Sequence, residues 1–228
     1  MRGIAENINS VKQVIAECAA SVGRDVNDIT LVAVTKTHAP QMINEAIRNG
    51  VTDIGENRVQ EILEKYNDVM PVNWHMIGHL QRNKVKYIID KVKMIHSVDS
   101  LRLAEEIDLR AGELKIKMDI LIQINPAEEE SKFGVKADSA GGLLVQILEN
   151  CKNLRVCGLM CVVPFAEEPE NVRGFFKEAK KRYDSFKSIN HERLALQYLS
   201  MGMSGDYSVA IEEGSNMVRV GTAIFGNR

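Results

Sequence analysis

The sequence predicts an α/β fold, a (β/α)8 TIM barrel with an extra N-terminal helix and no second domain. Eight short apolar runs alternate with longer stretches of helical period, and parallel strands need such crossover helices between them. The 228 residues lie near the low end of the roughly 200 to 400 that these barrels take, so residues 1–228 are expected to form one domain. The alternative is an open doubly wound sheet, but its glycine fingerprint GxGxxG and the loop GxxxxGK[ST] are both absent.

Each expected element has a local signature. Apolar residues spaced by three and four predict a helix before the first strand: Ile4, Ile8, Val11, Val14, Ile15 and Cys18. Apolar, β-rich runs predict strands at residues 30–35, 51–54, 73–77, 94–98, 118–124, 155–160, 195–199 and 217–220. Helical periods between these runs predict helices at residues 41–49, 58–66, 82–92, 100–111, 139–149, 170–188 and 204–213.

Composition narrows the class of protein. With 29 basic and 31 acidic residues the formal net charge is -2, which gives no electrostatic case for nucleic acid or an anionic membrane. Polar residues interrupt the first twenty positions and no apolar run approaches the length of a membrane span, so we expect a cytoplasmic protein. Four cysteines are too few for a disulfide scaffold, and we expect Cys157 and Cys161 to be buried free thiols.

Lys36 ends the first expected strand, in the stretch LVAVTKTH. Because side chains alternate along a strand, Val32, Val34 and Lys36 share one face. Functional residues of barrels gather at the carboxyl ends of the strands, and partial desolvation there favours the neutral amine that attacks a carbonyl to form a Schiff base. The alternative is an ordinary surface lysine at a strand end.

The C-terminal quarter contains two glycine-rich segments, LSMGMSGD and VRVGTAIFG. Ser204 is placed as the N-cap of a helix that Gly214 ends, and amides at a helix start favour an anion. Gly221 and Thr222 follow the last strand, where barrels often bind phosphate. Turn glycines and a simple cap are the alternative. Since the first and last strands of a closed barrel pair, Lys36 and such a cradle together favour an aldehyde that carries a phosphate, either pyridoxal phosphate or a sugar phosphate.

Other polar residues give weaker signals. His75 and His79 have the four-residue spacing of helical zinc sites, but they are expected on a strand and its following turn with Gly78 between them, and no third ligand is apparent, so no metal site is expected. We expect His79 at the polar rim of a pocket and His96 as a hydrogen-bonded core histidine. Lys132 is interpreted as a solvated loop lysine, with a second basic group near the site as the alternative.

Several segments carry a family resemblance: LVAVTKTH, DIGENRVQE, WHMIGHLQRNK, IHSVDS and LSMGMSGDYSVAIEEGSNMVRVGTAIFG. The sequence resembles the pyridoxal phosphate homeostasis proteins, which are single-domain barrels similar to the N-terminal domain of alanine racemase. The resemblance implies that Lys36 forms a Schiff base with pyridoxal 5'-phosphate, that Asn57 lies near the ring, and that Arg219 approaches the pyridine nitrogen. It also implies that the phosphate is held by Ser200, Ser204, Gly221 and Thr222.

The function implied by this resemblance is to hold the cofactor on Lys36 for intracellular vitamin B6 homeostasis, without catalytic turnover. A guanidinium stays charged, so Arg219 would keep the ring nitrogen unprotonated and weaken the cofactor as an electron sink. The alternatives are a pyridoxal-phosphate-dependent amino-acid racemase or decarboxylase, and a Schiff-base aldolase for a sugar phosphate. Racemisation needs a base on each face of the bound substrate, and in alanine racemase one comes from a partner subunit's β-domain, which this sequence lacks. We expect a monomer whose partners are apo-enzymes that receive the cofactor.

Overall fold

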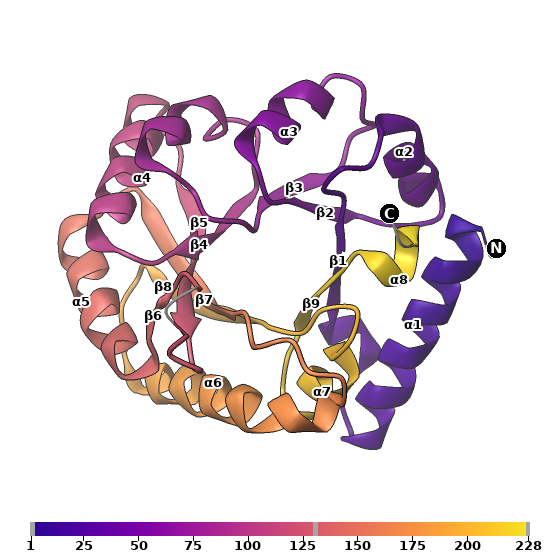
Figure 1. The fold of residues 1–228 in the computed structure, drawn as a ribbon. Coiled ribbons are helices and arrows are strands. Elements are labelled where there is room, and N and C mark those ends of the chain that lie inside the picture. The colour runs from indigo at the N-terminus through magenta and orange to yellow at the C-terminus, as the bar shows by residue number, and fades with distance from the viewer. Residues whose placement is uncertain (1–2, 130–131, 227–228) are drawn as a thin grey trace.

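One parallel sheet, closed into a ring, forms the centre of the molecule (Figure 1). The structure is a computed structural model and describes residues 3–129 and 132–226. Strands follow one another in the order β4-β3-β2-β1-β9-β8-β7-β5-β6, and an additional pairing of β4 with β5 closes the ring, while β6 pairs with the last two residues of β5. Helices surround the ring on its outside. The predicted (β/α)8 barrel with an extra N-terminal helix is therefore confirmed.

The strands occupy the positions that the apolar runs predict, to within about two residues at most ends. They are β1 (Thr30–Val34), β2 (Asp53–Glu56), β3 (Asn73–Met76), β4 (Met94–Val98), β5 (Met118–Asn125), β6 (Val135–Lys136), β7 (Leu154–Cys161), β8 (Leu194–Ser200) and β9 (Met217–Val220). The two-residue strand β6 is too short to leave a periodic signal in the sequence.

The α-helices are α1 (Ile4–Ser21), α2 (Pro40–Arg48), α3 (Val59–Lys65), α4 (Leu101–Glu113), α5 (Ala140–Asn150), α6 (Arg173–Ser185), α7 (Tyr207–Glu212) and α8 (Thr222–Phe225). Short 3₁₀ helices are η1 (Val26–Asp28), η2 (Arg82–Tyr87), η3 (Ala137–Ser139), η4 (Pro169–Val172) and η5 (Phe186–Ser188). The predicted helix at residues 170–188 is thus one α-helix with a 3₁₀ turn at each end.

Two helix predictions are wrong in part. Residues 82–92 form η2 and turns, because four β-branched residues with low helix propensity, Val85, Ile88, Ile89 and Val92, bury themselves through bonds such as Ile88 N–H to Val85 C=O (3.1 Å). The helix predicted at residues 204–213 begins only at Tyr207, so Ser204 is not its N-cap. Gly214 does follow the helix, with φ of 98°.

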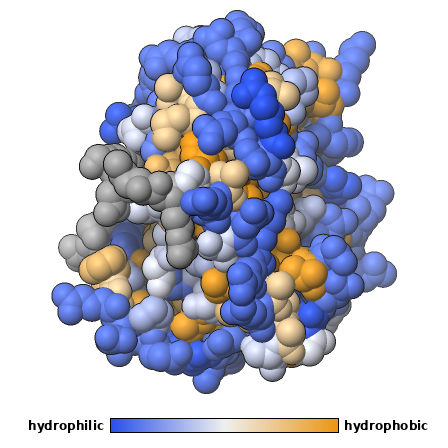
Figure 2. All heavy atoms as spheres, turned by 90° about the vertical axis from the view of Figure 1, so that its right-hand side faces the viewer, coloured by the Kyte–Doolittle hydropathy of each residue, from blue (hydrophilic) through white to orange (hydrophobic). Residues whose placement is uncertain are grey.

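The N-terminal helix α1 binds the C-terminal end of the chain to the barrel. Its apolar face, with Ile8 and Ile15, is buried, and it contacts α7 and α8. The Asn7 side chain donates to the Ile224 carbonyl (2.8 Å), and the Arg24 guanidinium, after the helix, donates to the Ser215 carbonyl (2.7 Å). The side of the molecule on which α1 lies, at the right of Figure 1, is mostly hydrophilic with scattered apolar side chains (Figure 2).

Apolar packing occurs in two layers. The larger one lies between the strands and the helices, and a small one of Met94, Leu121, Cys157 and Met160 forms a separate buried cluster on alternate residues of the strands. Cys157 and Cys161 are free and buried, as predicted. In the described ranges, no helix combines the length and the apolar character that crossing a membrane requires.

We predict that Gly158→Ala strongly destabilises the protein. Gly158 lies at the register shift between β7 and β8 with φ of 148°, and a Cβ there would come within 1.7 Å of the Tyr198 carbonyl oxygen. The free energy of unfolding should fall by about 2–4 kcal/mol in urea titrations. The matched control is Gly142→Ala inside α5, where a Cβ meets nothing within 4 Å, and stability should rise by about 0.5–1 kcal/mol. Equal effects at both positions would contradict this.

Candidate functional site

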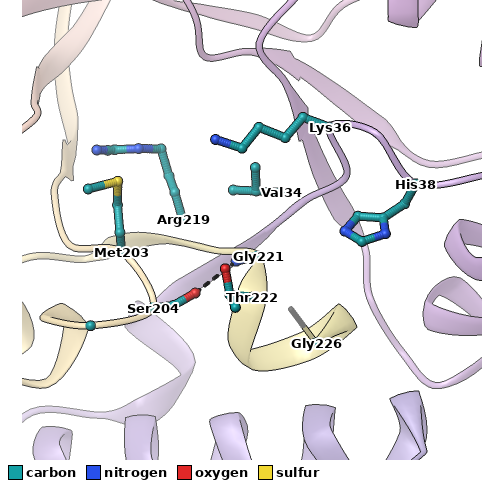
Figure 3. A pocket seen from close by; sticks show the side chains of 10 residues that line it. Val34, Lys36, His38, Met203, Ser204, Arg219, Gly221, Thr222 and Gly226 are labelled. Atoms are coloured by element: carbon teal, nitrogen blue, oxygen red, sulfur yellow. Dashed lines mark hydrogen bonds between the residues drawn. The ribbon is translucent and has the colours of Figure 1, made fainter. Parts of the chain in front are cut away.

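A cavity of about 470 Å³ lies at the carboxyl ends of β1 and β9 and beside the loop that follows β8 (Figure 3). Its volume is typical of a site for a small molecule. The residues that line it are Val34, Lys36, His38, Met203, Ser204, Gly205, Arg219, Gly221, Thr222 and Gly226. Five of the seven residues predicted for the site, namely Lys36, Ser204, Arg219, Gly221 and Thr222, are therefore brought together around one space.

Strand pairing sets the relative position of Lys36 and Arg219. β1 pairs with β9 with Val32 opposite Arg219, and alternation then puts Val34 and Lys36 on the same face, further toward the carboxyl end. In Figure 3 the Lys36 side chain and the Arg219 guanidinium extend into the same space above Val34, whereas the His38 ring lies apart from them, on the side of Gly226. The cavity thus holds an amine and a guanidinium on neighbouring strands.

The backbone on both sides of Lys36 is fixed by one cluster of charged side chains. Lys65, at the end of α3, donates to the Thr35 carbonyl (2.9 Å), to Glu56 Oε1 (2.8 Å) and to Glu61 Oε2 (2.7 Å), which uses all three hydrogens of its ammonium. Glu61 Oε2 also accepts the backbone N–H of Thr37 (2.5 Å). We call Glu56, Glu61 and Lys65 the Lys65 clamp.

The clamp stabilises an unfavourable backbone conformation. Thr37 has φ of 67°, a left-handed value that a β-branched residue rarely adopts and that costs about 1–2 kcal/mol. Burial raises the pKa of Glu56 despite its hydrogen bonds from Lys65 and Thr35. Burial acts in the same direction on Glu61, but hydrogen bonds from Lys65 and from the Thr37 amide outweigh it and lower its pKa. Such strain persists where the surroundings impose it, which is typical of functional sites.

The opposite wall of the cavity offers groups that suit an anion. The Ser204 hydroxyl oxygen accepts the N–H groups of Gly221 (3.2 Å) and Ala223 (3.3 Å), so its own hydrogen is available to the cavity. In the described part of the chain, the backbone N–H groups of Ser204, Gly205 and Thr222 have no hydrogen-bond acceptor. A Cβ on Gly205 would meet nothing within 4 Å, so this wall leaves space beside those amides.

Arg219 is only 3% exposed, and its side chain lines the cavity from the interior of the barrel. Its guanidinium donates to the Ser200 hydroxyl (2.6 Å) and to the Cys161 carbonyl (2.8 Å). Burial lowers its pKa, although a guanidinium remains charged at neutral pH. Ser200 is fully buried behind the Arg219 guanidinium and does not line the cavity. Its predicted contact with a phosphate stays a prediction, and this buried position speaks against it.

The remaining sequence candidates lie outside the cavity wall. The Asn57 side-chain oxygen is buried without a hydrogen-bond partner in the part of the chain that the structure describes, and Asn57 does not line the cavity, so its place near the ring stays a prediction. His79 stacks on Phe133 with ring centroids 3.7 Å apart, and Lys132 pairs with Glu129 (3.0 Å). His96 is fully buried and hydrogen-bonded, as predicted.

His38 lines the cavity and stacks on Phe225 with ring centroids 4.5 Å apart, a position that no sequence pattern indicated.

The arrangement suits an anionic carbonyl compound. An amine can condense with a carbonyl carbon, while hydroxyl and backbone N–H groups on the facing wall can bind a phosphate. The guanidinium beside the amine can donate to an acceptor atom but cannot act as an acid at neutral pH.

Comparison with known proteins identifies the family. Residues 4–228 match the family model of the alanine racemase N-terminal domain. The pyridoxal phosphate homeostasis protein of Aquifex aeolicus is 42% identical over 225 residues, which cover 98% of this chain and 97% of that protein. The chain belongs to the pyridoxal phosphate homeostasis protein family.

Two solved structures similar to this pyridoxal phosphate homeostasis family member support the assignment. PipY of Synechococcus elongatus, solved with pyridoxal phosphate bound, has a TM-score of 0.79 at 33% identity, and the match covers 93% of this chain and all of PipY. A protein of unknown function from Bifidobacterium adolescentis has a TM-score of 0.91 at 34% identity, covering 97% of this chain and 94% of that protein. The family resemblance noted from the sequence is thereby confirmed.

We predict that Lys65→Met destabilises the protein and loosens the segment around Lys36. Removing one partner from a buried ion pair leaves Glu56 uncompensated, which should lower the free energy of unfolding by about 3–5 kcal/mol. Hydrogen exchange at the Thr37 amide should accelerate, because Glu61 loses the ammonium that orients it. The control is Lys136→Met, which removes the exposed pair with Glu128 and should leave both measurements unchanged. Unchanged exchange at Thr37 in Lys65→Met would contradict the clamp.

Proposed function

We propose that this protein binds pyridoxal 5'-phosphate in the cavity at the ends of β1 and β9, held covalently by Lys36, and takes part in vitamin B6 homeostasis without turning over a substrate. The observation that carries the proposal is the meeting of Lys36, Arg219 and Ser204 around one cavity of about 470 Å³. Pyridoxal phosphate supplies, when bound, an aldehyde that condenses with a lysine amine and releases one water.

The residues present fit this cofactor. Lys36 provides the amine, and the Lys65 clamp holds the backbone on either side of it. On the facing wall, the hydroxyls of Ser204 and Thr222 and the unpartnered amides can bind the phosphate, with room left by Gly205. The relatives support the same assignment, since PipY was solved with pyridoxal phosphate bound and the Aquifex aeolicus protein is named for its homeostasis.

The residues that face the amine support storage over turnover. Arg219 keeps its positive charge and, placed at a ring nitrogen, keeps that nitrogen unprotonated, which limits stabilisation of a carbanion. Racemisation needs a base on each face of the substrate. Among the described residues that line the cavity, Lys36 and His38 carry side chains that can act as bases, and His38 stacks on Phe225 with its ring on the Gly226 side of the cavity, apart from the Lys36 amine.

We expect the protein mixed with pyridoxal phosphate to develop a visible absorbance band that borohydride removes. The reduced cofactor should then be found by mass spectrometry on the peptide that contains Lys36. Lys36→Ala should abolish the band, and Lys181→Ala, an exposed lysine of α6, should retain it.

Two results would count against this function. A protein that takes up no pyridoxal phosphate would rule out both the storage role and a pyridoxal-phosphate enzyme, and would favour an aldolase for a sugar phosphate. Sustained exchange of the α-proton of amino acids in deuterated water, over many turnovers of the loaded protein, would instead show an enzyme such as a racemase.

We also predict that Ser204→Ala reduces binding of pyridoxal phosphate about tenfold, the loss expected when one hydrogen bond to a charged group is removed. Pyridoxal, which lacks the phosphate, is the internal control, and its affinity should change by less than about twofold. Titrations followed by absorbance give both values. An equal loss for the two ligands would show that Ser204 stabilises the fold and does not bind the phosphate.

A further inference from the structure

A continuous line of hydrogen bonds crosses the interior of the barrel and ends at Arg219. It starts at Asp53 on β2, whose Oδ1 lies 2.9 Å from His75 Nε2 on β3. His75 Nδ1 lies 2.9 Å from His96 Nε2 on β4, and His96 Nδ1 lies 3.3 Å from the Ser200 hydroxyl on β8. The Ser200 hydroxyl accepts from the Arg219 guanidinium at 2.6 Å. All five residues are buried, with at most 6% exposure.

With both histidines neutral, the direction of every bond in this line follows from its two ends. An ionised carboxylate can only accept, so His75 donates from Nε2, and a neutral imidazole then accepts at Nδ1. His96 must then donate from Nε2 and accept at Nδ1, which requires the Ser200 hydroxyl to give its hydrogen to His96. The oxygen of Ser200 is left as an acceptor for Arg219, which can only donate.

The electrostatics agree with this direction. Burial disfavours the charged form of Asp53, but the hydrogen bonds from His75 and Thr52, with the nearby Lys93, outweigh it and lower its pKa to about 2. Burial, with the positive charge of Arg219, lowers the pKa of His96 well below its ordinary value, so that imidazole is neutral. Asp53 and Arg219 are thus opposite charges at the two ends of the line, with a neutral imidazole at His96 between them.

We propose that Asp53, His75, His96 and Ser200 are positioning residues for Arg219. We call them the Arg219 relay. The relay fixes both histidines as neutral tautomers with the hydrogen on Nε2, and it fixes the acceptor orientation of Ser200 that holds the guanidinium under the cavity. The effect of the relay on pyridoxal phosphate binding rests on the proposed function. The histidine tautomers do not, because they can be measured in the protein without any ligand.

The first test uses the cofactor-free protein. Nitrogen-15 NMR of histidine-labelled chain should show two histidines protonated on Nε2 alone, and the His96 signals should not titrate as the pH is lowered from 8 to 5.5. Assignment comes from the signals lost in His75→Gln and His96→Gln. A His96 protonated on Nδ1, or one that titrates with an ordinary midpoint, would overturn the relay. The expected tautomers in a protein that binds no pyridoxal phosphate would sustain the relay while the proposed function fails.

The second test measures coupling along the relay in the loaded protein. Ser200→Ala should weaken binding of pyridoxal phosphate about tenfold and shift the visible band of the bound cofactor, because Arg219 loses an acceptor. Asp53→Asn, at the other end, should act in the same direction. The two effects on affinity should be non-additive in the double variant, although groups so far apart ordinarily act independently.

Ser97→Ala is the matched control for this cycle. Ser97 is fully buried on β4 next to His96, and its hydroxyl has no hydrogen-bond partner within the described residues. This variant should leave the affinity and the visible band unchanged and should combine additively with Asp53→Asn. Additive effects of Ser200→Ala and Asp53→Asn, or wild-type spectra in both, would show that the line does not position Arg219.

Discussion

The pairing of the first strand with the last is the constraint on which the site depends. β1 and β9 are separated by most of the chain, yet their register places Val32 opposite Arg219 and so sets the distance from the guanidinium to Lys36 along one face. A slip of β9 by one residue against β1 would turn Arg219 to the outer face of the barrel and away from Lys36. The cavity is therefore a product of ring closure and not of any local motif.

Two polar assemblies then support the two basic residues of the cavity, Lys36 and Arg219, in different ways. The Lys65 clamp acts on the backbone around Lys36 from outside the ring, through an ion pair with carboxylates of β2 and α3. The line from Asp53 acts on the Arg219 side chain from inside it. Buried polar groups stabilise a fold only when each has its partner. The described atoms of the line all have one, whereas Glu56 Oε2, Asn57 Oδ1 and Ser97 Oγ do not.

The sequence was sufficient for the ring and for much of the cavity wall. Apolar runs at regular spacing predict parallel strands, and the position of Lys36, Gly221 and Thr222 directly after strands predicts their meeting at one end of the barrel. The sequence predicts that Ser204 caps the helix that follows it, but Ser204 does not cap α7. Its hydroxyl oxygen instead accepts hydrogen bonds from the backbone N–H groups of Gly221 and Ala223, at the start of α8. That contact depends on how two loops lie in space, which periodicity along the chain does not encode.

The clamp and the line were missed for a related reason. Glu61 and Lys65 have the four-residue spacing of a helical ion pair, a signal that points equally to a solvated helix face. His75 and Asp53 are isolated polar residues on strands, and a strand pattern gives the face of each residue but not the partner across the ring. Short elements such as α8 leave no period at all.

The hydrogen bonds between α1 and the C-terminal segment have a consequence for biosynthesis. Asn7 and Arg24 are made first, but their acceptors on Ile224 and Ser215 are made last, and β1 lacks its β9 neighbour until then. The cavity needs both ends as well, because Lys36 follows the first strand and Ser204, Arg219 and Thr222 belong to the last segment of the chain. A chain truncated before β9 would therefore carry Lys36 without the complete opposite wall of its cavity.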